Sequence, residues 1–156
     1  MPFARVVPVV DLKVRGLCVK PYPGHAHGCP NFFKKKGCPP RCPRLGDHFD
    51  LSMPCFIIWS EFDLAKHVRR MRDSHPGWSE RQLTCCLYWQ GTSRKKLTGE
   101  IAEFRARHPA YLVERCPEAM GLNVTATMSA AGVDLEWPPK RIVRTVAFAA
   151  VSRRSR

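Results

Sequence analysis

The pattern of apolar and polar positions predicts helices that alternate with strands from residue 47 onwards. A continuous apolar run at residues 55–61 (CFIIWSE) predicts a buried strand, and Ile142–Val151 is long enough for an interior strand of a sheet. Shorter apolar stretches at Tyr111–Arg115 and Val133–Trp137 predict two further strands. The chain is therefore expected to form a small sheet.

Helical spacing of apolar residues marks the segments between these strands. One helix is predicted to begin at Asp63 and to end at residues 75–77, where His-Pro-Gly stops it. Ser79 and Gln82 match a capping box, which predicts a second helix that continues to about residue 89. Two further helices are predicted from Leu97, Ile101 and Phe104, which precede Pro109, and from Ala126–Ala131, which precedes Gly132.

These elements predict an α/β fold with three to four strands packed against three to four helices. An irregular Cys-rich metal-binding loop is expected at the N-terminus. Residues 1–151 are predicted to form a single metal-binding domain, with the Cys-rich loop at 15–46 and the α/β scaffold at 47–151. Residues 152–156 (SRRSR) are predicted to be a basic tail.

Composition and charge narrow the function classes. The chain has 156 residues and a net charge of +13, and the excess is concentrated at its two ends. Residues 1–46 carry nine basic side chains and one acidic side chain, and residues 140–156 carry six basic side chains and none that is acidic. No apolar run approaches the roughly 20 residues that span a bilayer. A signal peptide is not expected, because Pro8, Asp11 and Lys13 break the first apolar run, so we expect a cytoplasmic protein with no membrane partner.

Four cysteines lie in a segment that has no regular apolar period. Cys18, Cys29, Cys38 and Cys42 occur within residues 17–43, together with six prolines and three glycines. Ordering such a segment costs conformational entropy, and thiolates bound to a metal would offset that cost. A set of structural disulfides is disfavoured in a reducing compartment. Burial as small apolar residues is expected instead for Cys55 and for one of Cys85 and Cys86.

The spacing of the cysteines favours an iron–sulfur cluster over zinc. The pattern C-x10-C-x8-C-x3-C lacks the paired C-x2-C of structural zinc sites. Proline follows Cys29, Cys38, Cys42 and the distant Cys116, and a Cys-Pro pair also ends the ligand run of bacterial ferredoxins. A [4Fe–4S] cluster held by Cys18, Cys29, Cys38 and Cys116 is predicted, with Cys42 as an additional metal ligand or as the fourth one. Zinc remains the alternative.

Polar residues near these cysteines have more than one interpretation. His25 and His27 would be ligands of a mixed Cys/His zinc site or donors to a ligand sulfur. The run Lys34, Lys35 and Lys36 would stabilise an anionic centre, attract an anionic small molecule or simply be solvated.

Two stretches of the chain resemble a known family. The stretches are CVKPYPGHAHGCPNFFKKKGCPPRCP and CPEAMGLNVTATMSAAGVDLEW, with the motifs Gly28–Asn31, Cys38–Pro40 and Glu118–Val124. They resemble an uncharacterised prokaryotic and phage family of Cys-rich predicted metal-binding proteins, a domain of unknown function. The resemblance implies metal ligation by Cys29 and Cys38, with Cys18 and Cys116 at matching positions. It implies no activity.

Two classes of function remain. In the first, the cluster has a redox or Lewis-acid role, and His25 or Glu118 moves protons. In the second, zinc stabilises a non-catalytic module that binds nucleic acid or an acidic partner through its basic ends. Its cations would be Lys34, Lys35, Lys36 and the tail, and Tyr22, Phe32 and Phe33 would stack on bases. No helix-turn-helix, zinc-finger or Walker pattern is present in the sequence.

Overall fold

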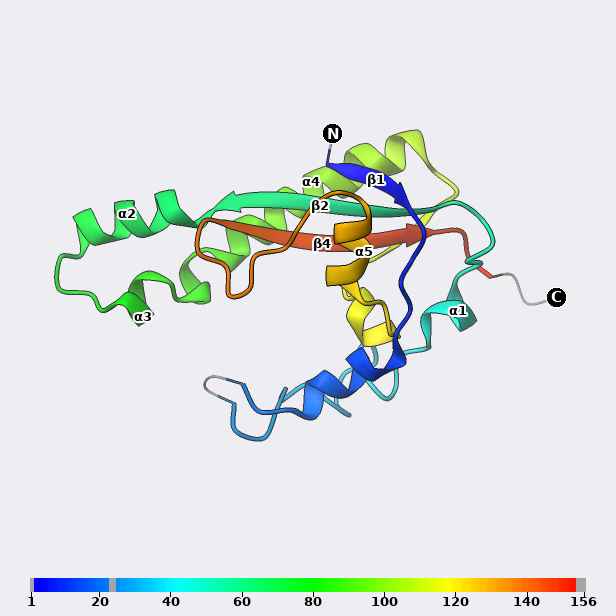
Figure 1. Cartoon of the computed structure of the whole chain (residues 1–156), viewed down its shortest axis with the longest axis horizontal. Coiled ribbons are helices and arrows are strands. Elements are labelled where there is room, and N and C mark those ends of the chain that lie inside the picture. Colours follow the sequence, from blue (N-terminus) through cyan, green and yellow to red (C-terminus); the bar gives the residue numbers. More distant parts are fainter. Residues whose placement is uncertain (1, 23–24, 154–156) are drawn as a thin grey trace.

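The centre of the molecule is a four-stranded antiparallel sheet. In the computed structural model, which describes residues 2–22 and 25–153, the strand order is β1-β2-β4-β3. The bounds are Phe3–Val6 for β1, Cys55–Asp63 for β2, Leu112–Glu114 for β3 and Ile142–Ala150 for β4. Figure 1 shows β2 and β4 as the two long central strands. The predicted α/β class, the sheet of three to four strands and the interior position of residues 142–150 are confirmed.

Both faces of the sheet are covered, which explains the continuous apolar run in β2. On one face Ile58 and Ala147 pack with Phe104 of helix α4 (Gln90–Arg107). On the other face Ile57 and Phe148 pack with α1 (Leu45–His48), with α5 (Val124–Ala130) and with the 3-10 helix η3 (Pro117–Met120). Because successive side chains of a strand point to opposite faces, a strand covered on both sides has no polar alternation.

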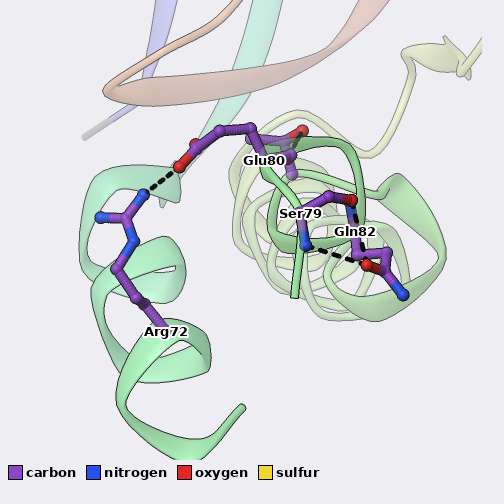
Figure 2. A network of polar contacts seen from close by, with 5 residues as sticks. Arg72, Ser79, Glu80 and Gln82 are labelled. Atoms are coloured by element: carbon purple, nitrogen blue, oxygen red, sulfur yellow. Dashed lines mark hydrogen bonds and ion pairs between the residues drawn. The ribbon is translucent and has the colours of Figure 1, made fainter. Parts of the chain in front are cut away.

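The helix after β2 and the short helix that follows it form an arm beyond one end of the sheet. Helix α2 is Leu64–Ser74, and Asp63 caps it by accepting a hydrogen bond from the backbone N–H of Lys66. The predicted capping box of Ser79 and Gln82 is present at the start of α3 (Glu80–Leu83). Figure 2 shows this box beside the ion pair of Arg72 and Glu80, which joins the two helices at 2.6 Å.

Several predicted boundaries were wrong. The second helix ends at Leu83 instead of about residue 89, and the 3-10 helix η2 (Cys86–Tyr88) follows it. Residues 133–137 do not form a strand; they lead from α5 towards β4, and Trp137 is largely exposed. Strand β1 was not predicted, because its four residues precede an apolar run that Pro8 interrupts. The described residues contain five α-helices, one more than the predicted upper number.

The first Cys-rich residues form a 3-10 helix, η1 (Leu12–Val19), where an irregular loop was predicted. The residues from 25 to 44 then run mainly through turns. We call residues 12–22 and 25–44 the Cys-rich cap. In Figure 1 the cap lies at the bottom, below the sheet and beside the yellow η3 segment.

Backbone hydrogen bonds attach the cap to the scaffold. The N–H of Asp11 donates to the carbonyl oxygen of Gly121 at 2.8 Å, and the N–H of Asn123 donates to that of Val9 at 2.8 Å. These bonds hold η1 against the segment that follows η3.

The predicted tail lies partly outside the described residues. Ser152 still pairs with Phe49 in an isolated β-bridge, whereas residues 154–156 lie beyond the described chain. Within the part of the chain that the structure describes, every helix is too short or too polar to cross a membrane.

Candidate metal centre

Cys18 and Cys29 are neighbours through their backbones. The N–H of Cys29 donates to the carbonyl oxygen of Cys18 at 2.7 Å. Gly28 makes this approach feasible: it is buried, its φ is +81°, and a Cβ atom built on it would lie 2.5 Å from the same carbonyl oxygen. Glycine is thus required here both for the backbone conformation and for the close contact.

Cys38 and Cys42 lie on one turn of the cap. The N–H of Cys42 donates to the carbonyl oxygen of Cys38 at 3.1 Å, and the N–H of Cys38 donates to that of Lys35 at 3.0 Å. Cys42 is buried, and its Sγ donates to the carbonyl oxygen of Ala119 in η3 at 2.9 Å. This thiol therefore links the cap to the segment that follows Cys116.

Arg15 joins η1 to the same turn. Its Nη2 donates to the carbonyl oxygen of Cys42 at 2.8 Å and lies 3.7 Å from the Cys42 Sγ. Neither Arg15 nor Ala119 was singled out by the sequence analysis. Their contacts join segments that are far apart in the chain, and no local sequence motif predicts such contacts.

Cys116 lies in the scaffold, shortly before Ala119, whose carbonyl oxygen accepts the hydrogen bond of the Cys42 thiol. It follows β3 and precedes η3, as predicted, and its N–H donates to Oε1 of Glu114 at 2.7 Å. Cys116 is exposed as a residue, while the surrounding chain removes part of the water around its sulfur atom. This desolvation raises the pKa of the Cys116 thiol, and the charges of Glu114, Glu118 and Cys38 raise it further.

Burial and neighbouring charges both act on the Cys18 thiol. Partial burial raises the pKa of the Cys18 thiol, and charge repulsion from Cys29, Cys38 and Cys42 adds to the effect, with a smaller contribution from Glu118. Several thiolates gathered in this way repel each other unless a cation lies among them. The donor set, sulfur from four cap cysteines with Cys116 nearby, suits a metal that prefers thiolate ligands.

The sulfur atoms do not yet form a coordination group. Among the residues that the structure describes, no three histidine, cysteine, aspartate or glutamate side chains are arranged so that they could hold a metal ion. Backbone contacts thus pair Cys18 with Cys29 and Cys38 with Cys42, and they do not complete a metal site.

The two histidines and the lysine run of the cap are exposed. The ring of His25 stacks on that of Tyr22, with centroids 4.5 Å apart, and His27 is exposed as well. Lys34, Lys35 and Lys36 are exposed, and within the described chain none of their ammonium groups forms an ion pair. Pro23 and Gly24, which precede His25, lie outside the described residues.

The remaining cysteines have mixed outcomes. Cys55 is buried in the main core, as predicted. The expectation of one buried thiol at 85–86 was wrong, because Cys85 is half-buried and Cys86 is exposed, after helix α3 has ended at Leu83. All eight cysteines are free thiols.

Comparisons with known proteins add no relatives. No protein-family model, no curated protein and no solved structure matches this chain. The resemblance to the Cys-rich predicted metal-binding family therefore rests on the quoted motifs alone and stays a prediction.

Proposed function

We propose that the Cys-rich cap binds a metal centre, with an iron–sulfur cluster favoured over zinc, and that the protein works in the cytoplasm. The ligands would come from Cys18, Cys29 and Cys38, together with Cys42, Cys116 or both. One observation supports the proposal most directly: hydrogen bonds connect the predicted ligands. The backbone of Cys29 bonds to that of Cys18, and the backbone of Cys42 bonds to that of Cys38. The Cys42 thiol bonds to the segment that follows Cys116.

The cap has little else to stabilise it. Cys42 and Pro39 are its buried apolar side chains, whereas Leu12, Leu17, Val19 and Phe33 are exposed. A segment of this kind gains folding free energy when thiolates coordinate a metal. Metal binding would replace the hydrogen bond of the Cys42 thiol, if Cys42 is a ligand, and would draw the neighbouring sulfur atoms together.

A bound cluster would supply electron transfer or, with one iron open, Lewis-acid chemistry. The residues of the chain would set its environment. Arg15 donates towards Cys42 and would stabilise negative charge on that sulfur atom. Glu118 is the second residue of η3, and desolvation raises the pKa of its carboxyl group above its ordinary value, which is the direction that favours a proton donor.

Anaerobic purification followed by elemental analysis tests the proposal. Iron with acid-labile sulfide and a visible absorption band would identify a cluster, and one zinc per chain would identify the alternative. Cys29→Ser and Cys38→Ser should each lose most of the metal. Cys86→Ser is the matched control, because Cys86 is an exposed thiol outside the cap and should leave the metal content unchanged. Retention of metal in both cap variants, or the absence of metal even after reconstitution, would refute the proposal.

A second candidate function uses the basic surface of the cap. The exposure of Lys34, Lys35 and Lys36, without ion-pair partners among the described residues, favours contact with an anionic partner such as nucleic acid. In this alternative zinc would only stabilise the cap. Binding to an oligonucleotide that weakens steeply with salt, and that replacement of the three lysines by alanine reduces, would support it.

A further inference from the structure

A cavity beside the cap is lined by several residues, of which only some have a role in the metal proposal. It has a volume of about 610 Å³, which is within the usual range of small-molecule sites. One wall comes from η1, a second from the turn that contains Cys42, and a third from α1. The lining residues are Arg15, Gly16, Phe32, Pro39, Pro40, Arg41, Cys42, Pro43, Arg44 and Asp47.

Three guanidinium groups border this cavity, and Asp47 is the one acidic residue of its lining. Arg15 is positioned by its 2.8 Å hydrogen bond to the carbonyl oxygen of Cys42. Arg41 makes a longer bond of 3.4 Å to the carbonyl oxygen of Lys34. The Arg44 side chain forms no hydrogen bond or ion pair within the described residues, so its donors are available.

Guanidinium groups favour phosphate and carboxylate ligands, because each offers parallel N–H donors in a fixed plane. Every arginine has five N–H donors, and the contacts of Arg15 with Pro40 and Cys42 all use Nη2, so the donors on Nη1 and Nε stay available. Three such groups around one opening are suited to a doubly charged phosphoryl group.

Apolar residues also contribute to the lining. Phe32 is half-buried, and its ring packs edge-on against Phe33 with centroids 5.3 Å apart. Pro39 is buried, and Pro40 and Pro43 line the cavity as well. A ring held in this way can stack on the flat part of a ligand.

We propose that this cavity binds a phosphorylated small molecule that also carries a planar ring, the class to which nucleoside monophosphates belong. The phosphoryl group would lie between Arg15, Arg41 and Arg44, and the ring would lie against Phe32. The site goes beyond the metal proposal: it needs no metal as a ligand, although it shares the Cys42 turn with the candidate centre.

Calorimetric titration of the full chain with adenosine monophosphate tests this site, with inorganic phosphate and adenosine as separate ligands. The nucleotide should bind more tightly than either part alone. Arg44→Ala should weaken nucleotide binding about tenfold, because one charge-assisted contact is lost at a partly exposed position, and Arg44→Lys should restore part of it. Phe32→Ala should weaken binding of the nucleotide but not that of phosphate.

Lys36→Ala is the matched control, because it removes one exposed cation of the same cap that does not line the cavity. It should leave nucleotide affinity within twofold. Circular dichroism verifies that each variant is folded. Absence of nucleotide binding, equal losses in the Arg44 and Lys36 variants, or phosphate binding as tight as that of the nucleotide would overturn the proposal. The titrations are made with metal-loaded and with chelator-treated protein. Nucleotide affinity and metal content are then measured separately, so failure of the nucleotide site can be told apart from failure of the metal proposal.

Discussion

Replacement of Gly28 by alanine should open the junction between Cys18 and Cys29. At φ +81° an alanine costs about 1–2 kcal/mol relative to its ordinary conformations. Its Cβ would also lie 2.5 Å from the carbonyl oxygen of Cys18 and 2.8 Å from the carbonyl carbon of Val19, and both atoms belong to the backbone. The two backbone segments must therefore move apart. This breaks the 2.7 Å hydrogen bond between Cys29 and Cys18, which costs about 1 kcal/mol. We expect a total of about 2–3 kcal/mol, confined to the cap.

Two other glycines calibrate this value. Gly132 has φ +78° but nothing within 4 Å of its Cβ position, so Gly132→Ala reports the conformational cost alone. Gly121 has φ +98° and would meet Leu12 Cδ2 at 2.7 Å, a flexible side-chain atom that can move, so Gly121→Ala should lie between the two.

The assay is the rate of thiol labelling in the native protein, combined with metal content. If the cap opens locally, 2 kcal/mol corresponds to a roughly 30-fold higher labelling rate, because each 1.4 kcal/mol is a factor of ten. Gly28→Ala should show at least this acceleration at Cys18 and Cys29 and should lose metal. Equal labelling rates and equal metal contents in the Gly28 and Gly132 variants would refute the reasoning.

Three further predictions concern the scaffold. Phe104→Ala should cost about 3–5 kcal/mol in urea unfolding, because Phe104 is fully buried, whereas Leu87→Ala at an exposed site should change stability by less than about 0.5 kcal/mol. Ser79→Ala should cost about 1 kcal/mol, measured as faster amide exchange in α3. Burial lowers the pKa of His67 below the ordinary value of 6.5, so on acidification the unfolded chain binds a proton at a higher pH than the folded protein does. The free energy of unfolding should therefore fall as the pH falls below 6.5, and His67→Leu should flatten this dependence.

Local signals in the sequence predicted the scaffold well. Asp63 and Ser79 begin helices because their side chains accept backbone hydrogen bonds within the next three residues, and such contacts are visible in the sequence. The apolar runs of β2 and β4 mark strands that are covered on both faces. The strand predicted at residues 133–137 was wrong, because the apolar side chains of a short connection have the same pattern as those of a short strand.

The candidate site was predictable in composition but not in arrangement. Proline and cysteine content singled out the cap, and Gly28 stands in a motif that could have suggested a strained backbone. The contacts of Arg15 with Cys42, and of Cys42 with Ala119, depend on how η1 docks against η3. That docking is a tertiary contact between segments that are far apart in the sequence, and no local pattern encodes it.

The pairing of β2 with β4 has a consequence for synthesis of the chain. Half of the sequence separates these partners, and the cap docks on η3, which also emerges late. At about 5–20 residues per second, the ribosome needs several seconds to produce η3 after Cys42 has appeared. During that interval the Cys42 thiol lacks its Ala119 partner, so we expect it to be more open to oxidation in the nascent chain than in the folded protein.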